Sequence, residues 1–281
     1  VPGSEVAHMQ TWSRFTVRML AAAALALGPA AHAQQTAAPA PQSAKTWVGR
    51  AAEMEDYLRT AKVVKMEETS VGVTRPRRAY LEPGGPVDSM TWKPIRPGVS
   101  GGFFESYRSE IAAYELDKLL GLEMVPPTVE KRVEGDLGAA VMWATPTRSF
   151  AQMGGKGAPT PPPIFVAKFS RELVRAKMFD NLIANIDPNL GNWLVDPSWN
   201  VILIDHSRTL TTNTRLVHRM THIDRELWAK MQALTEQQLK AAVGEWLGDR
   251  EIRALLERRR KLGEEIDKLV KANGPDAVFL K

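Results

Sequence analysis

Residues 178–210, MFDNLIANIDPNLGNWLVDPSWNVILIDHSRTL, constrain the fold of this chain more than any other segment. Their first part completes a helical pattern, and Pro188 and Gly191 then force a loop. Two short apolar runs follow, Trp193–Val195 and Val201–Ile204, and the turn sequence Asp-Pro-Ser lies between them. Apolar runs joined by such a turn are typical of a β-hairpin. The segment therefore predicts a long helix, a loop and a hairpin, in that order.

Three polar side chains occupy marked positions in this segment. Asp187 follows the helix, Asn192 opens the first hairpin strand, and Asp205 comes directly after four apolar residues. Phosphoryl transfer needs such a set, because one aspartate must orient the acceptor hydroxyl while an asparagine and a second aspartate hold the metal ion. The order of the residues predicts Asp187 as the catalytic residue and Asn192 and Asp205 as metal ligands. The alternative is that all three only cap loops and turns.

Two residues in the first half of the chain supply further contacts for a nucleotide. Lys93 lies in a predicted strand between apolar neighbours, which is an unusual place for a solvated lysine, and is the candidate to contact the phosphates. Glu110 lies on a predicted helix and is the carboxylate best placed to pair with Lys93, with Glu105 and Glu115 as competitors. Such a pair holds the ammonium group where the phosphates arrive. The alternatives are a solvated strand-edge lysine and an ordinary exposed glutamate.

Other candidate residues follow from weaker patterns. Gly72 and Thr74 lie in a turn whose backbone N–H groups could contact the phosphates, although no glycine-rich phosphate-binding pattern surrounds them. The segment around Trp143, where the strand-rich part ends, is expected to hold adenine; the alternative is that Trp143 is a core residue. His218 and His222 are four residues apart, but no third metal ligand lies near them in the sequence.

The order of the predicted elements divides the chain into two lobes. Short strands and one long helix dominate residues 47–144, whereas helices dominate residues 164–281. Between them, residues 145–163 are rich in Gly and Pro and predict a flexible hinge or lid loop. The sequence therefore predicts an α+β fold with a strand-rich N-lobe, a mainly helical C-lobe and a site between the lobes.

The N-terminal stretch has the pattern of an export signal. Arg14 and Arg18 precede the apolar run 19–27, and the small-residue site Ala-His-Ala ends at Ala33. This order is that of a secretory signal peptide, and the apolar run is far shorter than the ~20 residues that span a bilayer. We therefore expect residues 1–33 to be a cleaved signal peptide, and a periplasmic or secreted protein without a stable membrane span.

Composition and charge exclude several further classes. Residues 34–46, rich in Ala, Pro and Gln, predict a disordered leader. The chain has no cysteine, which excludes a lipoprotein anchor, a disulfide framework and a thiolate metal site. The net charge is +5, and the basic residues are scattered except at Arg75–Arg78 and Arg258–Lys261. The second run is expected to be a solvated helix face, so the sequence predicts no nucleic-acid function.

Three segments resemble the atypical kinases related to the phosphatidylinositol 3-/4-kinases, the HipA-type kinases and the Four-jointed-type secretory kinases. Residues 106–133, SYRSEIAAYELDKLLGLEMVPPTVEKRV, are similar to the helix and strand of these families. Residues 179–194 are similar to their catalytic loop, and residues 203–210 to their metal-binding segment. The resemblance covers the chain from about residue 63 to residue 210.

The resemblance implies an ATP-dependent kinase that uses Mg²⁺ or Mn²⁺ and transfers phosphate to an alcohol group. It implies a catalytic Asp187, the metal ligands Asn192 and Asp205, a phosphate-binding Lys93, and Glu110 as the partner of Lys93. Two departures stand out. Pro188 occupies a position where these families usually have Arg, and His206-Ser207 replace Phe-Gly after the metal-binding aspartate. His206 itself is either a structural histidine or a contact to phosphate or acceptor.

The sequence thus predicts an exported, metal-dependent phosphotransferase that moves the γ-phosphoryl group of ATP to a hydroxyl of a protein, sugar or lipid. Its partners would be a nucleotide and an unidentified hydroxyl acceptor. The ordered polar residues favour this enzyme, whereas Pro188 and the export signal favour a pseudokinase that binds nucleotide without turnover. A structural envelope protein without a ligand would explain the apolar core but not the ordered polar set.

Overall fold

A five-stranded antiparallel sheet forms the N-lobe, with the strands in the order β1-β2-β3-β7-β6. The computed structural model describes residues 42–69, 77–187 and 189–280, which belong to one structural unit. The central strand β3 pairs with β2 on one side and with β7 on the other, and Lys93 lies opposite Ala139 in this register. The strands are β1 (Val63–Glu68), β2 (Arg77–Leu81), β3 (Ser89–Lys93), β6 (Thr128–Val133) and β7 (Asp136–Met142).

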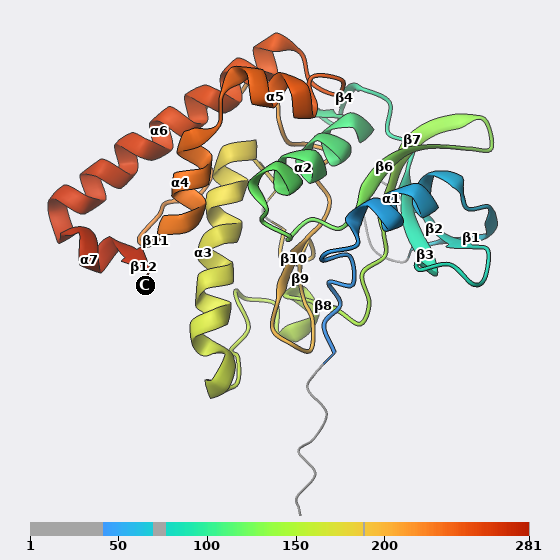
Figure 1. Ribbon diagram of the computed structural model, residues 1–281, viewed down its shortest axis with the longest axis horizontal. Helices are drawn as coiled ribbons and strands as arrows, with labels where there is room; N and C mark the ends of the chain where they lie inside the picture. The colour runs from blue at the N-terminus through green and yellow to red at the C-terminus, as the bar shows by residue number, and fades with distance from the viewer. Residues whose placement is uncertain (1–41, 70–76, 188, 281) are drawn as a thin grey trace, which may run out of the picture. The chain divides into compact units, whose positions relative to one another are not determined.

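Two helices, α1 (Ala51–Thr60) and α2 (Tyr107–Leu120), pack against β6 and β7 of this sheet (Figure 1). The side chain of Ser106 caps the start of α2 by accepting a hydrogen bond from the N–H of Arg108. Gly121 ends the helix in the left-handed conformation, with φ of 58°. A short hairpin of β4 (Gly98–Ser100) and β5 (Phe103–Glu105) comes directly before α2.

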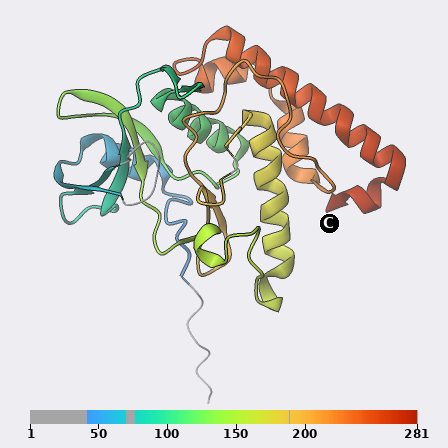
Figure 2. The ribbon, with the colours of Figure 1, turned by 180° about the vertical axis from the view of Figure 1, so that it is seen from behind.

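The C-lobe is mainly helical and contains a small second sheet. The hairpin of β9 (Trp193–Val195) and β10 (Val201–Leu203) is joined by β8 (Arg148–Ser149). The long helix α6 packs against α3, and in both views it lies on the side of the C-lobe away from the five-stranded sheet (Figure 1 and Figure 2). The remaining elements are α3 (Val166–Ile183), β11 (Ile223–Asp224), α4 (Arg225–Ala233), α5 (Glu236–Val243), α6 (Asp249–Asn273), α7 (Pro275–Val278) and β12 (Phe279–Leu280).

The apolar core continues from one lobe into the other. The larger cluster joins α2 and α3 to the hairpin and the C-terminal helices. A second cluster lies within the N-lobe, and it includes Trp47, Met90 and Trp92 together with Ile202 of β10. The hairpin therefore contributes to both clusters, which fixes its strands relative to the sheet. The predicted two-lobed α+β architecture is confirmed.

The structure corrects one local expectation and defines the end of the predicted long helix. Helix α3 ends at Ile183, because Ala184 adopts the left-handed conformation with φ of 53° and its N–H donates to the carbonyl of Asp180. Arg258 is not solvated but fully buried. Its guanidinium donates to the carbonyl of Leu182 at the end of α3, and to the carbonyls of Thr211 and Asn213.

The segments before and between the lobes are more ordered than the sequence suggested. Within the expected leader 34–46, Ala44 is fully buried and its neighbours Ser43 and Lys45 are half-buried. The expected hinge or lid loop, residues 145–163, contains strand β8, and Phe150 is buried in the larger core cluster. Within the three described ranges, no helix is long and apolar enough to span a membrane.

Candidate active site

A cavity of about 1000 Å³, here called the cleft, is lined by residues of both lobes. The N-lobe contributes residues of β2 and β3 and the end of β7, and the C-lobe contributes β8 and the loops around the hairpin. Of the residues predicted for the site, the cleft is lined by Lys93, Asp187, Asn192 and Asp205. Glu110 is buried next to Lys93 rather than in the cleft wall.

Lys93 connects the two lobes through a pair of carboxylates. Its Nζ lies 2.6 Å from Oε1 of Glu110 and 2.8 Å from Oδ1 of Asp205. Burial disfavours the ammonium form, but the negative charges of Asp205 and Glu110 prevail and raise the pKa of Lys93 above its usual value. Lys93 is therefore a fully charged lysine at the wall of the cleft. Its charge in turn lowers the pKa of Asp205, against the effect of burial.

Glu110 is the carboxylate that pairs with Lys93, and its second oxygen has a separate role. Oε2 of Glu110 accepts the backbone N–H of His206 at 3.0 Å, so α2 is fastened to the residue after Asp205. The competing glutamates have other partners, since Glu105 pairs with Arg208 and Glu115 with Lys118. Helix α2 thus sets the positions of both Lys93 and the segment that follows β10.

Asp187 lies in a loop that a buried polar network supports. Its backbone N–H donates to Oδ1 of Asn185 at 3.3 Å, and Nδ2 of Asn185 donates to Oδ1 of Asp180 at 3.0 Å. Asp180 is fully buried, and its other oxygen lies 3.0 Å from Nε2 of His218. These contacts fix the backbone of the loop, while the side chain of Asp187 stays 37% exposed and faces the cleft.

Asn192 lies beside Asp205 because the two hairpin strands are paired. The carbonyl of Asn192 accepts the N–H of Ile204 at 3.0 Å, one residue before Asp205. Both side chains line the cleft and offer oxygen ligands. In the described part of the chain, no group of three or more His, Asp or Glu residues could hold a metal ion alone. An amide and a carboxylate fit Mg²⁺ or Mn²⁺, since such ions are bound by few protein oxygens together with substrate phosphates.

Arg208 belongs to the site but was not predicted from the sequence. Its guanidinium contacts Oε1 of Glu105 at 2.6 Å and Oδ2 of Asp187 at 3.4 Å, and it lines the cleft. The one feature of the sequence that could have indicated Arg208 is its position, three residues after Asp205 in the segment that follows a predicted buried strand. That position alone does not reveal the two carboxylates it contacts, because both are distant in sequence.

The other predicted residues have different outcomes. Trp143 lines the cleft, and the guanidinium of Arg78 lies over its ring at 4.3 Å from the centroid. His206 is buried, which lowers its pKa to about 4 and keeps it neutral, in agreement with a structural histidine. His218 and His222 do not share a site, since His218 contacts Asp180 and His222 contacts Thr221. Gly72, Thr74 and Pro188 lie outside the described residues.

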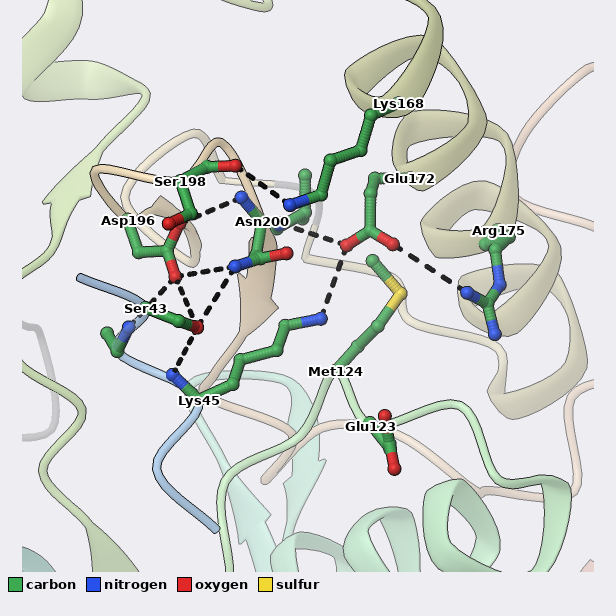
Figure 3. A network of polar contacts seen from close by, with 12 residues as sticks. Ser43, Lys45, Glu123, Met124, Lys168, Glu172, Arg175, Asp196, Ser198 and Asn200 are labelled. Carbon is green, nitrogen blue, oxygen red and sulfur yellow. Dashed lines mark hydrogen bonds and ion pairs between the residues drawn. The ribbon is translucent and has the colours of Figure 1, made fainter. Parts of the chain in front are cut away.

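A second polar network, centred on Asp196, connects the turn of the hairpin to the N-terminal part of the described chain. Oδ2 of Asp196 accepts the hydroxyl of Ser43 at 3.0 Å, the N–H of Ala44 at 2.9 Å and Nδ2 of Asn200 at 2.7 Å. Nζ of Lys45 lies 3.2 Å from Glu172 of α3. Figure 3 shows these side chains turned toward one another. We call residues 43–47 the N-terminal strap, because they run from this turn into the N-lobe core, where Trp47 is buried.

Comparison with known proteins places the fold. No protein-family model and no curated protein sequence matches the chain significantly. Among solved structures, a hydra Fam20 protein described with a sugar has a TM-score of 0.63 and 14% identity, over 82% of this chain and 91% of that chain. The Golgi casein kinase has a TM-score of 0.62 and 13% identity, over 82% and 77%. The same kinase with Mn and ADP bound has a TM-score of 0.61 and 12% identity, over 82% and 78%.

These identities are too low to define an activity. Each of the three matches nevertheless covers 82% of this chain. The kinase-like fold that the sequence motifs predicted is therefore confirmed. In fold, this chain is similar to the hydra Fam20 protein and to the Golgi casein kinase.

Proposed function

We propose that this protein is a kinase that transfers the γ-phosphoryl group of ATP to a hydroxyl acceptor with the help of a divalent metal ion. The observation that supports it most is the pair of contacts of Lys93 Nζ, at 2.6 Å to Glu110 and at 2.8 Å to Asp205. These residues meet at the cleft that Asp187 and Asn192 also line. The kinase-like fold and the Mn and ADP bound to one structural neighbour agree with this proposal.

Each residue has a task that its place in the cleft suits. Lys93 would contact the nucleotide phosphates, and Glu110 would hold its ammonium group at the cleft wall. Asp187 would take the proton of the acceptor hydroxyl while that oxygen forms a bond to the γ-phosphorus and the bond to ADP breaks. A metal ion held by Asn192 and Asp205 would neutralise the charge of the phosphates. The products are the phosphorylated acceptor and ADP.

The geometry of Asp205 is compatible with a metal ligand. Oδ1 of Asp205 lies 2.8 Å from Nζ of Lys93, and the side chain is 33% exposed and lines the cleft. Its lowered pKa keeps the carboxylate charged at neutral pH, as a ligand of a divalent cation must be. The same carboxylate can thus contact Lys93 with one oxygen and a cation with the other.

The place of action and the acceptor are further parts of the proposal. The signal-peptide pattern of residues 1–33 supports export to the periplasm or the outside of the cell. The acceptor would be a hydroxyl of a protein, sugar or lipid. The competing function is a nucleotide-binding pseudokinase, which Pro188 next to Asp187 favours because it supplies no cation.

The test separates binding from turnover. We expect ATP with Mn²⁺ to raise the melting temperature of the mature protein more than either alone, and radiolabelled ATP to yield a phosphorylated product or free phosphate. Asp187→Ala should bind Mn·ATP nearly as the parent does, but lose transfer by about 100-fold or more. Asp136→Ala, an exposed residue outside the cleft, is the control. A parent that binds nucleotide but transfers nothing would be a pseudokinase.

A further inference from the structure

Arg208 lies between two carboxylates that come from different lobes. Its Nε and Nη2 atoms both lie 2.6 Å from Oε1 of Glu105, and its Nη1 lies 3.4 Å from Oδ2 of Asp187. Glu105 ends strand β5 and its side chain is 8% exposed, so it is a fixed and largely desolvated partner. The contact with Asp187 is longer and more exposed. Glu105 therefore holds the guanidinium of Arg208 in place, and the guanidinium contacts Asp187 in the loop after α3.

Further contacts hold Arg208 in place from the other sides. The carbonyl of Ser207 accepts the N–H of Ser106 at 2.9 Å, which fastens the backbone before Arg208 to the start of α2. The guanidinium lies over the ring of Phe103 at 4.9 Å from the centroid. An arginine held by a carboxylate, a ring and a neighbouring backbone contact is preorganised, so it loses little side-chain freedom when it orients another group.

We propose that Arg208 is the positioning residue for Asp187, and that it fixes one carboxylate oxygen so that the other faces the acceptor hydroxyl. This role rests on the proposed function. Oδ2 of Asp187 accepts from Arg208, whereas Oδ1 accepts no hydrogen bond from a residue in the ranges 42–69, 77–187 and 189–280. The next residue in the sequence, Pro188, supplies no cation of its own. Arg208 thus provides, from the segment after β10, the positive charge that this loop lacks.

Two other roles for Arg208 lead to different measurements. If Arg208 only anchored the start of α2, its loss would lower stability and all functions of the cleft together, because α2 also holds Lys93 through Glu110. If it bound the phosphates, its loss would weaken nucleotide binding. A positioning residue acts in the transition state, so its loss lowers kcat while the affinity for Mn·ATP stays.

The experiment uses the mature protein with Arg208→Gln, Arg208→Lys and Glu105→Gln. We expect Arg208→Gln to lower kcat about 10-fold to 100-fold, the range for a misplaced reacting group, with an unchanged Kd for Mn·ATP. Arg208→Lys should recover part of the loss, because it keeps the charge. Glu105→Gln should lower kcat in the parent but have little further effect in Arg208→Gln, since Glu105 acts through Arg208. Arg96→Gln, an 87% exposed arginine outside the cleft, is the control.

The outcomes separate this inference from the proposed function. A parent that binds Mn·ATP and transfers no phosphate would refute the proposed function and this role with it. Unchanged kcat in Arg208→Gln, with an active parent, would refute only the role of Arg208. An equal loss of kcat and of Mn·ATP affinity would overturn it in favour of phosphate binding or a general structural role, and the melting temperature of the variant decides between these two.

Discussion

The N-terminal strap should contribute to the stability of the whole fold, and Asp196→Ala is the substitution that tests this. Asp196 is 2% exposed and accepts hydrogen bonds from Ser43, Ala44 and the side chain of Asn200 with one oxygen. Its other oxygen accepts the N–H of Asn200 at 2.9 Å. Alanine would remove the acceptor for all of these donors. The strap and the hairpin turn would lose their common partner at once.

The size of the stability loss depends on which of the donors can form a hydrogen bond with water after the substitution. A hydrogen bond to a charged group contributes about 1.5–3 kcal/mol, and a buried donor left without a partner costs about 1–3 kcal/mol. The N–H of Ala44 belongs to a fully buried residue and has no such alternative, whereas Ser43 and Asn200 are only partly buried. Because these terms are not additive, we expect Asp196→Ala to lower the free energy of unfolding by about 3–5 kcal/mol. Ser43→Ala removes a partly buried hydroxyl that donates to Asp196 and accepts from the N–H of Lys45 and from Nδ2 of Asn200, and it should lower the free energy of unfolding by less, about 1–2 kcal/mol.

The assay is urea unfolding of the mature protein, followed by tryptophan fluorescence and by circular dichroism. The control is Asp136→Ala, because Asp136 is 57% exposed and its contact with Arg96 is a surface ion pair, for which about 0–1 kcal/mol is typical. If Asp196→Ala and Asp136→Ala have the same unfolding midpoint and slope, the strap adds nothing to stability and the reasoning is wrong. A lower midpoint with an unchanged slope is the expected result.

Three further predictions concern the cleft, pH and export. Asp205→Asn should weaken Mn·ATP binding more than it weakens ATP binding without metal, whereas Lys93→Ala should weaken both. Titration calorimetry measures these affinities. Equal behaviour of the two variants would contradict the assignment of Asp205 as a metal ligand. Burial lowers the pKa of His206 to about 4, below the ~6.5 of an unfolded chain, so only the unfolded chain binds a proton between these values. Stability of the metal-free protein should therefore fall by up to about 3 kcal/mol as the pH drops from 7 to 4, and His206→Gln should flatten this dependence in urea unfolding at each pH. The mature chain should begin at Gln34, and mass spectrometry that finds residues 9–33 retained in a membrane fraction would exclude this.

Local sequence signals predicted most of the elements and the polar residues of the cleft. The apolar neighbours of Lys93 indicated that it is not a solvated lysine, and the structure buries its side chain. Such a signal is local, because it depends on residues nearby in the chain. The hairpin with Asn192 and Asp205 was predicted for the same reason, since its turn and its apolar runs are contiguous.

The features that the sequence did not predict depend on partners far away in the chain. Arg208 looks like an ordinary loop arginine until Glu105 and Asp187 are placed beside it. The strap residue Ala44 lies in a stretch whose composition is typical of disorder, yet its N–H donates to the buried carboxylate of Asp196, 152 residues later in the chain. Neither pairing leaves a local pattern, because a hydrogen bond between distant segments depends on the tertiary structure and not on neighbouring residues.

The burial of Arg258 changes how a shortened chain would have to be interpreted. This residue of α6 donates to the carbonyl of Leu182, near the end of the helix before Asp187, and to the carbonyls of Thr211 and Asn213, which follow Arg208 in the chain. A chain that stops before residue 249 would keep Lys93, Asp187 and every other polar residue of the cleft. It would nevertheless lose the guanidinium of Arg258, which connects the end of α3 to the segment after Arg208. Loss of function after deletion of α6 would then reflect the loss of a structural support for the cleft. It would not show that α6 carries a catalytic group or an acceptor site.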